Sequence, residues 1–117
     1  MAEIVVVEAS DTLTHIQLRG RLDTAGVEDV ELELTKQTVT RRKPAIVDIS
    51  AVGLLASIGI GMLVKIARSM HSHGIIFGVV ATGLSKENLE RLKVNTIFPV
   101  VATYEEALRA LMLEPEA

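Results

Sequence analysis

The stretch from residue 44 to 72 constrains the fold most, because it joins an apolar strand to an amphipathic helix. Residues 45–49 are Ala-Ile-Val-Asp-Ile, a compact β-branched run bounded by Pro44 and typical of a buried strand. Beyond a turn-prone stretch, apolar residues recur at helical spacing, at positions 60, 63, 64, 67 and 70. We therefore predict a strand over 45–49, a loop, and a helix over 57–72.

The same alternation of strands and helices extends over the whole chain. The other predicted elements are strands at 4–7 and 13–19, a helix at 25–39, a strand at 75–80, a helix at 85–92, a strand at 97–101 and a final helix that ends near Leu113. Alternating elements imply right-handed crossovers and parallel pairing. The sequence thus predicts an α/β fold. Its sheet is mixed but mostly parallel, with about five strands, the N-terminal strand antiparallel, and about four helices.

Several residues have the chemistry of helix ends. Asp23 or Thr24 is predicted to cap the helix at 25–39, and Gly74 to end the helix at 57–72. Ser85 stands at the expected start of the helix at 85–92. Thr103, with a glutamate three residues later, predicts a capping box for the last helix.

The composition excludes several classes of function. A chain of 117 residues with 49% hydrophobic content fits a single domain over 1–117. Aromatic residues make up only 3% and the net charge is −3, so we expect no direct contact with nucleic acid and no membrane insertion. The absence of cysteine and of an export signal predicts a cytoplasmic protein. His71 and His73 do not share a helix face, so no metal is expected. The glycines at 59 and 61 begin a dinucleotide fingerprint that lacks its third glycine, so no nucleotide cofactor is expected either.

Ser57 stands where the predicted helix begins. There the first backbone N–H groups lack partners within the helix, and the helix dipole is positive. Serine is a common cap at such a position, so one interpretation is an ordinary helix cap. The same donors would favour an added phosphate, so the other interpretation is a modification site.

A serine at a strand-to-helix turn also suggests a hydrolase nucleophile. The hydrolase elbow requires a glycine two residues before the serine, but this chain has Leu55 there. His15 lies inside a predicted strand, and His71 is 14 positions after Ser57, about 21 Å along a helix. Because a catalytic base must touch its nucleophile, the sequence predicts that the protein is not an enzyme.

The segment around Ser57 resembles the signature of the STAS family, the anti-sigma factor antagonists and their relatives. Residues 48–50 match the strand end of that signature, Ser57 matches its phosphoacceptor and Gly59 its glycine. Three further stretches, at 20–23, 83–85 and 98–107, resemble the family's turn after the second strand, its third helix entry and its closing strand and helix. The resemblance covers nearly the whole chain.

This resemblance implies a function in transcription regulation and bacterial signalling. The protein would bind an anti-sigma factor that is also a serine-protein kinase, would be phosphorylated on Ser57, and would be reset by a serine phosphatase. Helical spacing places Ser57, Gly61, Lys65 and Arg68 on one exposed stripe, and by resemblance Asp23 belongs to the same partner-facing surface. Two of these residues have a structural alternative: Asp23 as a plain helix cap, and Gly61 as a site of tight helix packing.

Ala56 precedes Ser57, where phosphorylated members of the family usually carry an acid, and Ile58 follows it. This departure favours an alternative in which the domain docks without phosphorylation. It would then be a subunit of a stress-signalling scaffold or of a lipid-transport ATPase complex. Binding of a small ligand is a third hypothesis, and the sequence leaves a homo-oligomer open.

Overall fold

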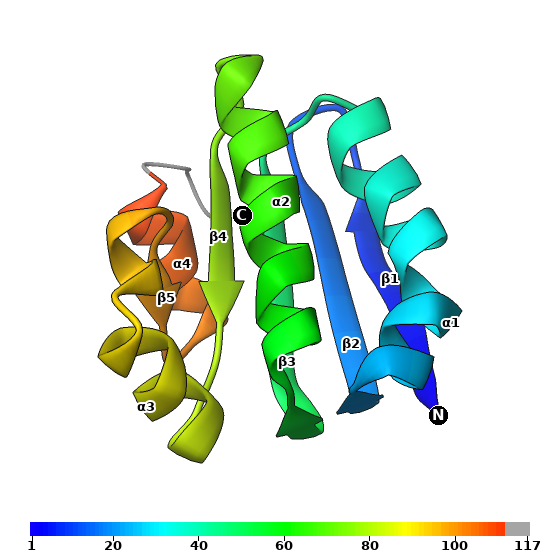
Figure 1. Ribbon diagram of the computed structural model, residues 1–117. Helices are drawn as coiled ribbons and strands as arrows, with labels where there is room; N and C mark the ends of the chain where they lie inside the picture. Colours follow the sequence, from blue (N-terminus) through cyan, green and yellow to red (C-terminus); the bar gives the residue numbers. More distant parts are fainter. Residues whose placement is uncertain (112–117) are drawn as a thin grey trace.

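The computed structural model describes residues 1–111, which form a five-stranded sheet with helices on both faces (Figure 1). The strands are β1 (Ala2–Ala9), β2 (Thr14–Leu22), β3 (Ala45–Leu55), β4 (Phe77–Val80) and β5 (Val100–Val101). The helices are α1 (Thr24–Thr35), α2 (Ser57–Ser72), α3 (Gly83–Arg91) and α4 (Tyr104–Ala110). A π-helical turn at Lys36–Thr40 continues α1, and a 3-10 turn at Val94–Thr96 follows α3.

The strand order is β1-β2-β3-β4-β5. The β1 strand is antiparallel to β2, and all the other neighbouring strands are parallel. Because β2 to β5 run in the same direction, their carboxyl ends lie at one edge of the sheet, which we call the carboxyl edge. The predicted fold class is therefore confirmed, including the antiparallel N-terminal strand.

The sheet separates two apolar cores. The larger core is formed by α1, α2 and α3 on one face, and Leu18, Leu34, Leu63 and Leu89 are fully buried in it. The smaller core lies under α4 on the other face, where Ile46 packs with residues such as Leu108. Aliphatic side chains dominate both cores, as the composition predicts.

The predicted end of the third strand at residue 49 is wrong, because β3 continues to Leu55. Residues 51, 52, 54 and 55 pair in register with 19, 20, 21 and 22 of β2. Two register irregularities accompany this pairing, and only Val52 and Leu55 in it are buried. The stretch predicted as a loop is thus a partly exposed strand.

The ends of β2, α3 and β5 also differ from prediction. The second strand was predicted to end at residue 19, but Gly20 lies inside β2 with φ of 92°. The Met1 carbonyl oxygen lies too close to Gly20 to leave room for a side chain. The α3 helix begins at Gly83, so Ser85 lies inside it and does not cap it. The β5 strand is shorter than predicted because the Ile97 amide closes the preceding turn on Val94 O at 2.9 Å.

The predicted caps at Asp23, Gly74 and Thr103 agree with the structure, although α1 itself ends at Thr35 and the predicted residues 36–39 lie in the π-helical turn. Asp23 caps α1 by accepting a hydrogen bond from Gly26 N at 2.9 Å. Gly74 follows α2 with φ of 71°, and the Thr103 hydroxyl accepts from Glu106 N at 3.1 Å. The predicted end of the last helix at Leu113 lies outside the described residues.

Candidate functional site

The carboxyl ends of β2 and β3 place Asp23 and Ser57 at one edge of the sheet. Leu22 pairs in register with Leu55, and the next amide, that of Ala56, donates to Leu22 O at 3.1 Å. Asp23 directly follows Leu22, and Ser57 directly follows Ala56. Backbone pairing therefore brings together two residues that are far apart in the sequence.

Ser57 is the first residue of α2 and is exposed. The cap position belongs to Ala56, whose extended backbone (φ −83°, ψ 167°) precedes the helix and whose side chain cannot accept a hydrogen bond. Within residues 1–111 the Ser57 hydroxyl makes no hydrogen bond. The interpretation of Ser57 as an ordinary helix cap is therefore wrong, and its hydroxyl faces solvent unpaired.

An exposed stripe continues from Ser57 along α2 through Gly61, Lys65 and Arg68. A Cβ atom built on Gly61 has no neighbour within 4 Å, so the alternative that Gly61 packs tightly is wrong. Lys65 Nζ lies 3.8 Å from Glu31 Oε2 of α1, and both side chains are exposed. The stripe thus begins with a hydroxyl, crosses bare backbone and ends with two cations.

Gly59, on the buried side of the same turn, is the glycine that packing requires. A Cβ atom there would lie 2.8 Å from both Cβ and the carbonyl oxygen of Leu22, and 3.1 Å from Leu55 Cδ1. The first turn of α2 therefore sits directly on the paired ends of β2 and β3. This close approach fixes the position of Ser57 relative to Asp23.

Asp23 is held by local hydrogen bonds. Its Oδ1 accepts from Gly26 N at 2.9 Å, and its Oδ2 accepts from Arg21 Nε at 3.3 Å. The Gly26 amide and then the Arg21 side chain lower the pKa of Asp23, because both favour the charged carboxylate. The edge beside Ser57 therefore carries a fixed negative charge at neutral pH.

Comparison with known proteins decides the family. A family model described as the STAS domain matches residues 4–107. The chain belongs to the STAS domain family. A search of curated proteins gave no match.

Solved structures share the fold of this STAS domain. An anti-sigma factor antagonist from Mycobacterium paratuberculosis has a TM-score of 0.83 at 24% identity, with 96% of this chain and 95% of that chain covered. A putative anti-sigma factor antagonist from Thermotoga maritima has a TM-score of 0.79 at 18% identity, with 90% and 92% covered. The anti-sigma factor antagonist SpoIIAA in its unphosphorylated form has a TM-score of 0.66 at 18% identity, with 92% and 96% covered. At these identities the likeness shows the fold.

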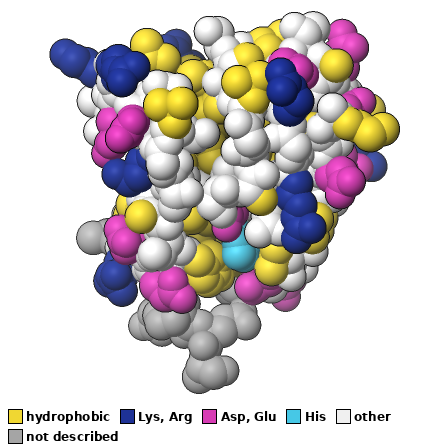
Figure 2. All heavy atoms as spheres, turned by 90° about the horizontal axis from the view of Figure 1, so that it is seen from below, with side chains coloured by type: hydrophobic (Ala, Val, Ile, Leu, Met, Phe, Trp, Pro, Cys, Tyr) yellow, Lys and Arg dark blue, Asp and Glu magenta, His cyan; other side chains and the backbone are white. Residues whose placement is uncertain are grey.

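Sequence reasoning missed three apolar side chains at the carboxyl edge of this STAS domain. Leu54 and Ile58, which flank the helix start, are 39% and 43% exposed, and Leu84 at the start of α3 is 67% exposed. Figure 2 looks onto this end, where hydrophobic side chains reach the surface among charges of both signs. The sequence could have indicated this exposed apolar surface through Ile58, because Ile58 is an apolar residue outside the buried stripe of its helix.

His15 lies on the opposite face of the sheet, away from α2. Its ring stacks on Tyr104 with centroids 4.3 Å apart, and its buried Nε2 has no hydrogen-bond partner within the described chain. Burial lowers the pKa of His15, and the carboxylates of Asp48 and Glu8 oppose that shift. His15 is therefore not placed to act on Ser57. In the described part of the STAS domain, no helix is both long and apolar enough to cross a membrane.

Proposed function

We propose that this STAS domain is an anti-sigma factor antagonist. In this proposal it binds an anti-sigma factor with serine-kinase activity and is switched by phosphorylation of Ser57 in the cytoplasm. The observation that carries the proposal is the position of Ser57, exposed in the first turn of α2 with no hydrogen bond on its hydroxyl among residues 1–111. A kinase needs such an accessible hydroxyl.

The partner surface is formed by Asp23, Ser57, Gly61, Lys65 and Arg68. Support comes from the pairing that brings Asp23 and Ser57 to one edge and from the open space over Gly61. A partner can approach the backbone closely at Gly61 because no side chain stands there. The exposed cations at the other end of the stripe add electrostatic complementarity to an acidic partner.

Phosphorylation acts through charge in this proposal. A phosphate adds about −1.5 to −2 charges at neutral pH, and it would stand at the edge that already carries the Asp23 carboxylate. Because the proposed partner is acidic, the phosphate would face like charges across the contact, which costs several kcal/mol, so the partner would dissociate. A serine phosphatase would then restore the binding form.

The protein itself catalyses nothing in this proposal. No histidine or carboxylate in the described chain hydrogen-bonds the Ser57 hydroxyl, so no general base activates it there. The anti-sigma factor would supply the kinase activity, and the STAS domain would be its substrate.

The test compares wild type with Ser57→Ala and Ser57→Glu for binding to the cognate anti-sigma factor, by calorimetry. We expect Ser57→Ala to bind within a few-fold of wild type. Ser57→Glu should bind at least about tenfold more weakly, because it places a charge in the contact. A Thr40→Glu variant adds a charge at an exposed position outside the surface and should bind like wild type. Equal affinity for all four proteins would contradict the proposal.

One set of observations favours a second candidate, a docking subunit that is never phosphorylated. Leu54 and Ile58 expose apolar surface on both sides of Ser57, which suits permanent burial under a partner. The partner would be a stress-signalling scaffold or a lipid-transport ATPase complex. Intact mass of the protein from its own host, before and after phosphatase, separates the candidates. A phosphate mass that phosphatase removes supports the switch, and its absence under all growth conditions supports constitutive docking.

A further inference from the structure

A groove lies between the C-terminal half of α2 and residues 96–99, far from the carboxyl edge of the sheet. Its inner part is a cavity of about 160 Å³ lined largely by apolar side chains, including Ile75, Phe77 and Phe98. Its outer part is about 390 Å³ and is lined by residues that include Arg68 and His71. The two parts share Ala67, His71 and Ile97, so they lie side by side, and we treat them as one groove.

The groove exposes apolar surface at its rim. Ile76 and Ile97 are 43% and 40% exposed, although both line the inner part. An aliphatic chain in the inner part would cover these side chains, and burial of each methylene would raise the affinity about three- to fourfold. The inner part is therefore suited to a chain of a few methylenes.

The outer part is suited to an anion. No aspartate or glutamate is among the described residues that line either part, although the chain has a net charge of −3. Arg68 and His71 are three residues apart on α2, so their side chains are neighbours on one helix face. Neither forms an ion pair within residues 1–111.

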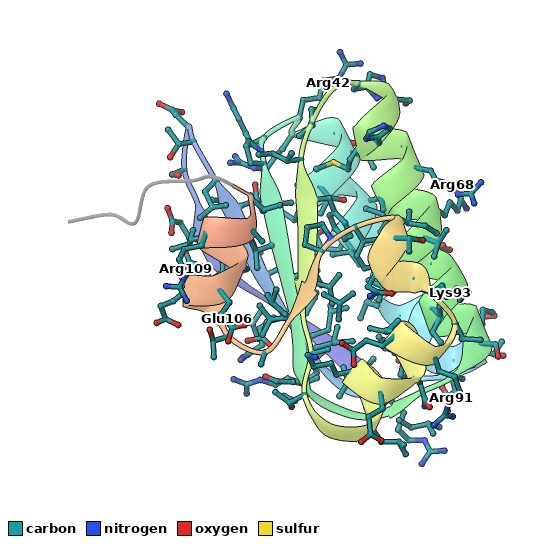
Figure 3. The ribbon with its side chains drawn as sticks, turned by 90° about the vertical axis from the view of Figure 1, so that its left-hand side faces the viewer. Arg42, Arg68, Arg91, Lys93, Glu106 and Arg109 are labelled. Carbon is teal, nitrogen blue, oxygen red and sulfur yellow. The ribbon has the colours of Figure 1, made fainter. Side chains whose placement is uncertain are left out.

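Other polar groups of the outer part are already occupied. The Ser72 hydroxyl donates to Ser69 O at 2.7 Å, and the Thr96 hydroxyl donates to Lys93 O at 2.6 Å. Arg68 and His71 are left as the side chains able to donate to a ligand. In Figure 3, Arg68 extends from α2 on the same side of the molecule as Lys93.

We propose that this groove binds an amphipathic monocarboxylate, with its aliphatic chain in the inner part and its carboxylate beside Arg68 and His71. The groove lies away from the candidate phosphorylation site, because His71 follows Ser57 by 14 residues on α2, about 21 Å along the helix. Arg68 is the one residue that the groove shares with the proposed partner surface. A single carboxylate matches the paired donors, and a short aliphatic chain matches a small cavity of about 160 Å³ with mostly apolar lining residues.

The test uses octanoate as the probe, titrated into the full chain and followed by ¹H–¹⁵N NMR. We expect saturable shifts at Ala67, His71 and Ile97, and affinity that rises about three- to fourfold per methylene from hexanoate to octanoate. Octylammonium has the same chain with the opposite charge and should bind at least about tenfold more weakly. Equal affinity for the two amphiphiles, or no saturable shift below the micelle concentration of octanoate, would overturn the proposal.

Two variants and a matched control locate the site. Arg68→Gln removes the cation and should weaken octanoate about tenfold, whereas Ile97→Asn removes the apolar rim and should weaken it several-fold. Arg91→Gln removes an exposed cation that does not line the groove and should leave the affinity unchanged. Equal loss in Arg68→Gln and Arg91→Gln, or binding of acidic peptides without binding of octanoate, would refute the assignment. Ser57→Ala should bind octanoate normally, so this result is independent of the proposed switch.

Discussion

Two glycines two residues apart in α2, which lie on opposite sides of the helix, should respond in opposite directions to the same substitution. In Gly59→Ala the new methyl group would lie 2.8 Å from the Leu22 carbonyl oxygen and Cβ. Forcing a group into a packed site costs about 1–3 kcal/mol, and the better helix propensity of alanine returns up to about 1 kcal/mol. We therefore expect Gly59→Ala to lower the free energy of unfolding by up to about 2 kcal/mol.

Gly61→Ala meets no atom within 4 Å, so only the helix propensity changes. We expect it to raise the free energy of unfolding by about 0.5–1 kcal/mol. Urea unfolding followed by circular dichroism measures the free energy of unfolding of both variants. In a thermal melt, each kcal/mol should move the melting temperature by about 3–6 °C. Effects of the same sign in Gly59→Ala and Gly61→Ala would refute the distinction between a packing glycine and a surface glycine.

Three further predictions concern single side chains. His15→Phe keeps a ring against Tyr104 and removes a group whose folded pKa lies below its ordinary 6.5. Wild type should therefore lose stability as the pH falls below about 6.5, and the variant should lose less in urea unfolding at pH 7.5 and 5. The pKa of Asp23 is lowered, so its carboxylate stabilises the fold above its unfolded pKa, and this stabilisation is lost as the pH falls through its folded pKa. Asp23→Asn should therefore make the free energy of unfolding depend less on pH below about pH 4. Lys65→Ala removes an exposed ion pair to Glu31 and should change the free energy of unfolding by less than about 0.5 kcal/mol, while weakening the salt dependence of partner binding.

The sequence predicted α2 with its observed bounds because several local signals agree there. An apolar stripe of period 3.6 runs between a turn-prone stretch and Gly74, whose φ of 71° ends the helix. The end of β3 lacked such agreement. Gly53 and the consecutive apolar residues around it hide the alternation of a strand, and what makes 51–55 a strand is its pairing with β2. That pairing joins segments about 30 positions apart, so local patterns do not reveal it.

The candidate site was predictable to a similar degree. The stripe from Ser57 to Arg68 follows from helical spacing alone, and the structure places all four of its residues on the exposed face. Spacing did not distinguish the roles of Gly59 and Gly61, because that depends on how closely the helix approaches Leu22. Nor did it show that Ala56 takes the cap position, since helix ends are uncertain by one or two residues.

The cap position of α2 gives the family resemblance a physical meaning. Phosphorylated relatives usually have an acid at the position of Ala56, and in this chain that position is the N-cap of α2, where a carboxylate could accept from the first amides of the helix. Ala56 cannot make this cap, and Ala56→Asp should raise the free energy of unfolding by about 1 kcal/mol. The same change would place a carboxylate beside the phosphoacceptor. Ala56→Asp would therefore change two properties at one residue, the stability of the fold and the surroundings of the serine that a kinase would recognise. Measuring both in the same variant shows whether a gain in stability alters recognition by the kinase.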